Sequence, residues 1–226
     1  MQYRQGATLA AYRRGQAYFR RRAAELGRYA DVPAKRRLDR LIEGLAGAFA
    51  GEVRTTKTAE ALTERKHELR QHLRNVQMAS IVAIARASRL LGLGIDGMSA
   101  FRVPRIRTSD LTLLAEARAL RKAAKPNASV FVHMGLSRNF LEEFDAVVDE
   151  LNEVIVAHAG QLLQHHKYSV AAKVFIRQGR ETLDMLTALV RVALGRRRPD
   201  LMAEWHSAIR VAGKPGPARK RRKGSE

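Results

Sequence analysis

Apolar residues in this 226-residue chain recur at alternating spacings of three and four, and this pattern limits its possible folds more than any other feature. Between residues 59 and 90, ten consecutive positions keep this step: Ala59, Leu62, Lys66, Leu69, Leu73, Val76, Ser80, Ala83, Ala87 and Leu90. The step keeps one face of an α-helix apolar, because a helix turns once in about 3.6 residues. The stretch therefore predicts one long helix, with Lys66 and Ser80 as tolerated or register-fixing positions.

The same spacing predicts helices in the rest of the chain. Pro33 suits the first turn of a helix, and Ser109 followed by Asp110 is typical of a helix start. Only 6% of the residues are aromatic, and alanine and leucine dominate the apolar set, which favours closely packed helices over sheets. The expected helices lie within 7–30, 33–49, 59–90, 109–134 with a kink at the proline, 137–162, 171–192, and from Pro199 past Trp205.

We therefore predict an all-α fold, an elongated antiparallel bundle of about six helices. Residues 1–212 are expected to form the bundle domain. Residues 213–226, GKPGPARKRRKGSE, have no large apolar side chains to bury and are expected to be a disordered basic tail.

The stretch GLGIDG, residues 92–97, matches G-x-G-x-x-G, the fingerprint of dinucleotide-binding enzymes. That fingerprint requires a strand before the first glycine and a helix at the last, because the pyrophosphate rests on the helix N-terminus. Here a predicted helix precedes Gly92, and no helical period follows until residue 109. Gly92 or Gly94 is therefore expected to take the left-handed conformation that ends a helix, and no cofactor is expected.

Two histidine patterns resemble metal sites, but the first has the wrong spacing and the second occurs only once. HELRQH, residues 67–72, looks like a metalloprotease helix, but His67 and His72 are five apart, about 140° around a helix. Glu64 and His67 form a single E-x-x-H, whereas di-iron bundles use that unit in pairs. The chain has no cysteine, so thiolate chemistry is excluded. We predict no catalytic residues, no metal site and no enzyme activity.

Other titratable groups leave two interpretations open. His158 lies in an apolar seam and His165 lies one heptad further on, which fits a pH-sensitive or ligand-binding pair. The interpretation that we favour is a partly buried His158 with a local partner, and exposed His165 and His166 at a helix end, where imidazolium also suits the helix dipole. A cluster of acidic residues predicts a solvated face or a dock for arginines of another chain: Glu142, Glu143, Asp145, Asp149, Glu150 and Glu153.

The net charge is +20 at pH 7, and the isoelectric point is about 11.2. Residues 1–30 carry seven Arg against one Glu, and residues 214–226 carry six Lys or Arg against one Glu. Such an excess attracts polyanions, whether nucleic acid, ribosomes or an anionic membrane surface. No apolar run is long enough to span a membrane, and no secretory signal is recognisable, so a cytoplasmic location is expected.

The basic helix predicted within residues 7–30 is the main candidate site. Arg14, Arg21 and Arg28 are spaced by sevens, as are Arg13 and Arg20, so neighbours in a row lie about 10 Å apart, a spacing suited to successive backbone phosphates. Tyr18 falls on the same polar face, where it can stack on a base or on its own arginines. An ordinary solvated helix face is the competing interpretation. The tail adds Arg219, Lys220, Arg221, Arg222 and Lys223.

Three stretches carry a resemblance to known sequences: FRVPRIRTSDLTLLAEARAL (101–120), HMGLSRNFLEEFDAVVDEL (133–151) and RPDLMAEWHSAIRV (198–211). In this layout the chain resembles a family of uncharacterised all-helical bacterial proteins, over about half its length. The resemblance implies a bacterial, cytosolic helical protein without an established activity. Many members lack the basic tail, so the resemblance does not explain it.

We expect a non-catalytic binding protein that associates with nucleic acid or another polyanion, without reading its sequence, through the first helix and the tail. The alternative is a structural or adaptor protein that binds another protein, or itself, through an exposed helix seam or the acidic face.

Overall fold

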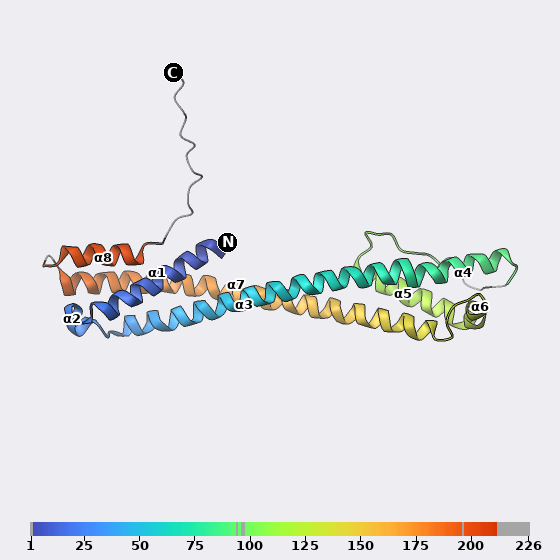
Figure 1. Cartoon of the computed structure of the whole chain (residues 1–226), viewed down its shortest axis with the longest axis horizontal. Coiled ribbons are helices and arrows are strands. Elements are labelled where there is room, and N and C mark those ends of the chain that lie inside the picture. Colours follow the sequence, from blue (N-terminus) through green and yellow to red (C-terminus); the bar gives the residue numbers. More distant parts are fainter. Residues whose placement is uncertain (1, 94, 96–97, 196, 212–226) are drawn as a thin grey trace, which may run out of the picture. The chain divides into compact units, whose positions relative to one another are not determined.

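The structure, a computed structural model, describes residues 2–93, 95, 98–195 and 197–211. These residues form helices and connecting segments without any β-strand, which confirms the all-α prediction. The α-helices are α1 (Gln2–Arg21), α2 (Ala23–Leu26), α3 (Pro33–His72), α4 (Ala79–Leu90), α5 (Asp110–Ala124), α6 (Ala128–His133), α7 (Phe140–Leu194) and α8 (Pro199–Ile209) (Figure 1). The predicted starts at Pro33, after Ser109 and at Pro199 are confirmed.

Tertiary contacts divide the helices into two compact units, to which α3 and α7 both contribute. The first unit comprises Met1–Arg54 and His165–Glu226, and the second comprises Thr55–Gln164. Each unit has its own apolar core, the first built around Trp205 and the second around Phe131. The predicted end of the bundle domain, between residues 212 and 213, lies outside the described residues.

Glycines on α3 set how closely it approaches α7 in the first unit. A Cβ added to Gly44 would lie 2.8 Å from the ring of Phe175, and one added to Gly51 would lie 2.5 Å from the ring of Tyr168. Both distances are shorter than a real Cβ tolerates, so only glycine fits at these two positions. Gly44 and Gly51 lie one heptad apart on α3, and the two rings that they face lie one heptad apart on the antiparallel helix α7. The two helices predicted on either side of Gly51 are one, because this glycine packs inside a helix and does not end it.

A π-helical turn over Leu73–Met78 joins α3 to α4 and corrects the predicted seam of the second unit. Leu69 and Leu73 are buried as expected, but Val76 is 49% exposed and Leu90 is 89% exposed. A π-turn holds about one residue more than an α-turn, so the buried face moves out of step with the three-four pattern. From the end of the turn onward the buried residues are Met78, Ile81, Val82, Ala85 and Ser88.

Gly92 ends α4, as predicted. It has a φ of +72°, and the amide of Leu93 donates to the carbonyl of Ser88 at 2.9 Å, while the Gly92 amide donates to Arg89 at 3.1 Å. This is the Schellman arrangement, which satisfies the free carbonyls at a helix end. Gly94, the other glycine predicted as a cap, lies outside the described residues.

In the second unit, the Ser109 hydroxyl accepts a hydrogen bond of 3.2 Å from the amide of Thr112 and caps α5, as predicted. The kink expected at Pro126 is a 3₁₀ turn, Lys125–Asn127, between α5 and α6. The two helices predicted from 137 to 192 are one 55-residue helix, α7. His165 and His166 therefore lie inside a helix and not at a helix end, and the dipole argument for them was wrong.

Candidate nucleic-acid interface

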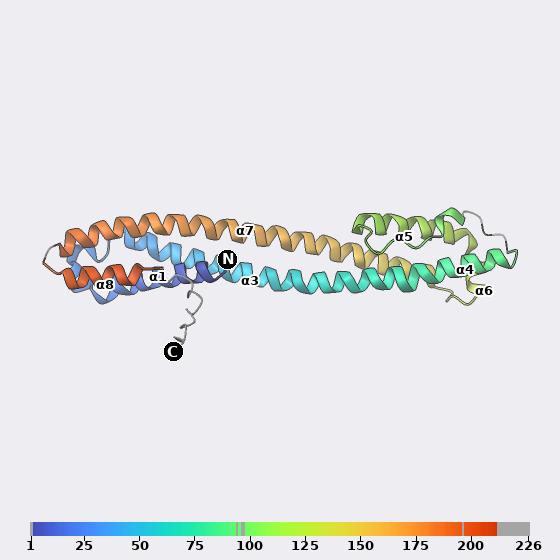
Figure 2. The same ribbon diagram turned by 90° about the horizontal axis from the view of Figure 1, so that it is seen from above.

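Helix α1 is buried on two faces in the first unit, not on one. Tyr12 and Phe19 belong to the predicted apolar seam and pack in the core. A second row, Ala11, Gly15 and Tyr18, is also buried, because α8 lies alongside α1 (Figures 1 and 2). Small side chains in this row allow the two helices to approach closely. Helix α8 thus removes part of the surface that the sequence assigned to solvent.

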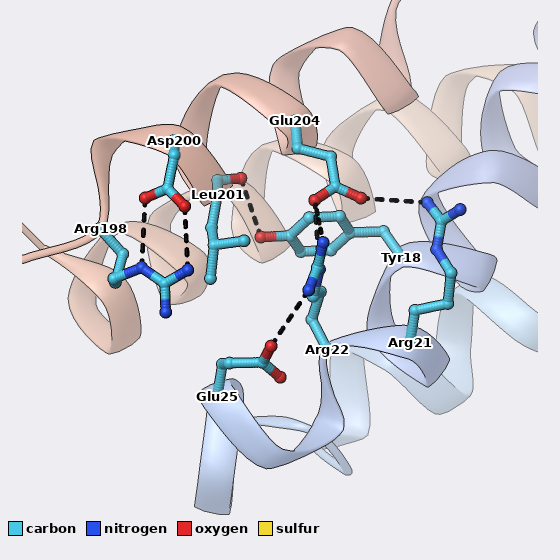
Figure 3. Close-up of polar contacts among 8 residues, drawn as sticks. All are labelled: Tyr18, Arg21, Arg22, Glu25, Arg198, Asp200, Leu201 and Glu204. Carbon is cyan, nitrogen blue, oxygen red and sulfur yellow. Dashed lines mark hydrogen bonds and ion pairs between the residues drawn. The ribbon is translucent and has the colours of Figure 1, made fainter.

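Tyr18 lies inside this contact and not on the surface, which corrects the prediction that its ring is free to stack on a base. Its side chain is fully buried, and its hydroxyl donates to the carbonyl of Leu201 at 2.9 Å (Figure 3). Its ring centroid lies 5.3 Å from that of Trp205. Burial, and next the nearby Glu204 carboxylate, raise the pKa of Tyr18. The residue fastens α8 to α1.

Arg14 contacts the C-terminal end of α8. Its Nε donates to the carbonyl of Ala208 at 3.0 Å and its Nη2 donates to that of Arg210 at 2.6 Å. The last carbonyls of a helix lack partners within the helix and carry partial negative charge, so a guanidinium stabilises them. Arg14 therefore has a structural role, and its remaining N–H groups make no hydrogen bond to another described residue.

Arg21 and Arg22 share one carboxylate on α8 (Figure 3). Arg21 Nη2 lies 3.2 Å from Glu204 Oε1, and Arg22 Nη2 lies 2.9 Å from Glu204 Oε2. Arg22 also pairs with Glu25 at 3.2 Å. Hydrogen bonds to Glu204 and Glu25 raise the pKa of Arg22, and the pKa of Glu25 is lowered, first by its own backbone amide and then by Arg22. Arg21 remains 63% exposed despite its partner.

Arg13 and Arg20 are the predicted residues that stay free. Both are exposed on α1, one heptad apart, and neither makes a hydrogen bond or an ion pair to another described residue. Seven residues of helix span about 10 Å, so the two guanidinium groups form a short row along the helix.

A groove of about 720 Å³ runs between α1 and α8 beside this row. Arg14 and Arg21 from α1, and Arg210 from the end of α8, line it together with Glu204 and Ser207. Three guanidinium groups face one carboxylate there, so the groove carries excess positive charge. We call Arg13, Arg14, Arg20, Arg21 and Arg210 the arginine surface. The α8 contribution was missed in the sequence, because only the docking of α8 brings it beside α1.

Arg28 does not extend the row, which corrects the prediction of a single line through Arg14, Arg21 and Arg28. Helix α1 ends at Arg21, and Gly27, with a φ of +53°, turns the chain before Arg28. Arg28 contacts its neighbour Tyr29, with Nη2 at 2.9 Å from the hydroxyl and Cζ at 5.0 Å from the ring centroid. The predicted tail residues lie outside the described residues: Arg219, Lys220, Arg221, Arg222 and Lys223.

The other titratable candidates have local partners. His158 Nε2 lies 3.1 Å from Thr63 Oγ1, and His165 Nε2 lies 3.7 Å from Glu52 Oε1. Asp145 of the acidic cluster pairs with Arg121 at 2.6 Å, and Glu150 pairs with Arg65 at 2.5 Å. These arginines belong to the same chain and partly neutralise the cluster. In the described part of the chain, no three His, Asp or Glu residues are grouped to hold a metal ion.

No protein-family model, no curated protein and no solved structure matches the chain. The resemblance to helical bacterial proteins therefore stays a prediction. Among the described residues, no helix combines the length and apolar character needed to cross a membrane.

Proposed function

We propose that the chain binds nucleic acid without sequence specificity, through the arginine surface of the first unit. The observation that carries the proposal is the row of Arg13 and Arg20, free of carboxylates, beside a groove lined by three further arginines. The first unit holds 27 Lys and Arg against 10 Asp and Glu, so it carries +17 of the chain's net charge of +20. Phosphates neutralised by such side chains release counterions, which drives association.

We infer that the arginine surface binds through its charge, and not by stacking on bases or by reading their sequence. Tyr18 is buried, so its ring is not offered for stacking, and recognition rests on guanidinium groups. Arg14 and Arg21 contribute through the N–H groups that α8 leaves unused, whereas Arg13 and Arg20 contribute their whole side chains. The basic tail adds to the same electrostatic attraction on sequence grounds alone.

The test is fluorescence anisotropy with short single-stranded and double-stranded DNA and RNA over a salt series. We expect binding at low salt that weakens steeply as salt rises, with little dependence on sequence. Replacing both Arg13 and Arg20 with Gln lowers the slope of log K against log salt by about 2, since each lost phosphate contact removes about one unit. Lysine at both positions restores most of the affinity, because charge and not fork geometry is used.

The control is Arg86→Gln with Arg89→Gln, which removes two exposed arginines from α4 in the second unit. It changes the net charge equally but leaves the arginine surface intact. Equal loss of affinity in both double variants would contradict the assignment to α1, and absence of binding at low salt would contradict the proposed function. Replacing the five basic residues 219–223 with Gln measures the contribution of the tail to the affinity separately.

A protein-adaptor role is the second candidate, favoured by exposed apolar side chains on α7 in the second unit. Val156 is 65% exposed, Leu162 is 51% exposed and Leu163 is 56% exposed. Exposed apolar side chains grouped on one helix are typical of protein contacts. If the chain does not bind nucleic acid at low salt, the adaptor role becomes the favoured function.

A further inference from the structure

The second unit contains a small pocket that the proposed function does not use. It has a volume of about 80 Å³ and lies between the end of α3 and the segment that precedes α5. His67, Arg70, Gln71 and Arg74 line one side, and their spacing of three, one and three places them on one helix face. Arg105, Ile106 and Thr108 line the other side, and Leu113 closes it.

Arg70 is fixed by contacts next to the pocket. Its Nη1 bonds Asp110 Oδ1, and its Nη2 donates to the carbonyl of Thr108 at 2.5 Å. Lys66 Nζ bonds the second oxygen of Asp110 at 3.1 Å. The carboxylate of Asp110 is therefore occupied by two cations, Lys66 and Arg70.

Arg74 and Arg105 bring further charge to the pocket without a carboxylate partner in the described part of the chain. Arg74 lies in the π-turn and uses Nε to bond Asn75 Oδ1 at 3.0 Å, which leaves its terminal nitrogens free. Arg105 is exposed and makes no hydrogen bond through its side chain to another described residue. π-turns recur at functional sites, because they redirect side chains out of the helical step.

Arg70 is neutralised by Asp110, whereas Arg74 and Arg105 bring to the pocket two positive charges that no described carboxylate neutralises. A bound anion with several oxygens would compensate these charges. The planar fork of arginine matches the oxygens of a tetrahedral phosphoryl group, and Gln71 and Thr108 add polar groups to the wall. The volume suits one such group. We propose that this pocket binds a phosphoryl oxyanion, either free phosphate or the phosphate of a monoester, with Arg74 and Arg105 as its direct ligands.

The test is isothermal titration calorimetry of the full chain with inorganic phosphate and, separately, with adenosine monophosphate, at constant ionic strength. We expect saturable binding with one site per chain for at least one of the two probes. If only phosphate binds, the ligand is the free anion, and if the monoester binds at least as tightly, the ligand is a phosphorylated molecule. Absence of saturable binding of both probes overturns the proposal.

Two variants locate the binding. Arg74→Gln with Arg105→Gln weakens the affinity at least about tenfold, because each removes charge-assisted hydrogen bonds. Arg107→Gln removes an equally exposed arginine two residues away that does not line the pocket, and it binds as the wild type does. Equal weakening by Arg107→Gln overturns the proposal.

If the double variant unfolds, Arg105→Gln alone replaces it as the test. The side chain of Arg105 contacts no partner among the described residues, so its loss is not expected to affect folding. Its affinity for the probe must fall, and unchanged affinity overturns the proposal. The double variant Arg13→Gln, Arg20→Gln tests the proposed function, and we expect it to leave phosphate binding in the second unit unchanged. Either proposal can therefore be contradicted without affecting the other.

Discussion

The hydroxyl of Tyr18 donates a hydrogen bond of 2.9 Å to the carbonyl of Leu201, a residue 183 positions later in the chain. This bond joins α1 to α8 at the point where Trp205 packs against Tyr18 and Phe19. Trp205 is itself fully buried and donates through Nε1 to Thr187 Oγ1 at 3.0 Å. The two ends of the described chain are therefore held together by a polar and aromatic cluster inside the first unit.

Tyr18 is expected to affect stability and not nucleic-acid contact. Tyr18→Ala removes a buried aromatic side chain and lowers the free energy of unfolding by about 3–5 kcal/mol. Tyr18→Phe keeps the ring but leaves the Leu201 carbonyl without its partner, and it costs about 1 kcal/mol. Urea unfolding measures both variants. Fluorescence anisotropy of Tyr18→Phe checks that Tyr18 does not contact nucleic acid. A selective loss of binding to single-stranded nucleic acid would mean that its hydroxyl does.

Gly179 of α7 is expected to tolerate no side chain. A Cβ there would lie 2.2 Å from the ring of Tyr12, whose hydroxyl donates to the carbonyl of Ile176 at 2.7 Å. Gly179→Ala therefore displaces a buried ring and lowers stability by about 1–3 kcal/mol. Gly47→Ala is the matched control in the same unit, because nothing lies within 4 Å of its added Cβ and alanine favours the helix by about 1 kcal/mol. A stabilising Gly179→Ala would contradict the close approach of α1 and α7.

Two neighbouring arginines of α1 are expected to behave differently. Arg14→Gln removes hydrogen bonds to the carbonyls at the end of α8 and lowers stability by about 1 kcal/mol. Arg13→Gln leaves stability within about 0.5 kcal/mol of the wild type, as for most exposed positions without a partner. Thermal melts followed by circular dichroism compare the two. An equal loss of stability in both variants would show that Arg14 does not cap α8.

Alkaline pH is expected to destabilise the first unit through Tyr12. Burial raises the pKa of Tyr12 from 10.0 to about 12, against a smaller lowering by Arg180. The folded state favours the neutral phenol, so this contribution to stability is complete below pH 10 and is lost as the pH rises through about 12. The loss amounts to about 2 kcal/mol.

Urea unfolding of wild type and Tyr12→Phe over this pH range isolates the effect of the phenol. The variant starts about 1 kcal/mol less stable at neutral pH, because the Ile176 carbonyl loses its donor. Its stability then falls less steeply between pH 10 and 12. Parallel curves for the two proteins would show that the Tyr12 hydroxyl is not buried in solution.

Local signals in the sequence predicted several helix ends correctly. Pro33, Ser109 and Gly92 each act through their own backbone geometry or a hydrogen bond to a residue close in sequence. Such effects need no tertiary partner, so they are visible in a single sequence. The break predicted between the helices at 33–49 and 59–90 was wrong, because Gly51 disfavours a helix locally but lies inside α3, where it makes room for the ring of Tyr168, more than a hundred residues away.

The candidate sites depended on tertiary structure to a greater degree. Arg13 and Arg20 are exposed as predicted, because the helical period alone opposes them to the apolar seam. Tyr18 shares that polar face in the sequence, and only the docking of α8 buries it. The phosphate pocket combines Arg74 with Arg105, which are brought together by the return of the chain after α4.

The sequence by itself determined that this chain is helical and strongly basic, with its excess of positive charge concentrated in residues 1–30 and 214–226, because composition and periodicity act locally. Only the tertiary structure decided which arginines remain free. Arg21 and Arg22 share Glu204, Arg14 caps α8, and each of these contacts crosses more than 180 residues of sequence. Charge is a property of composition, whereas its availability to a ligand depends on the neighbours that folding brings within hydrogen-bonding distance.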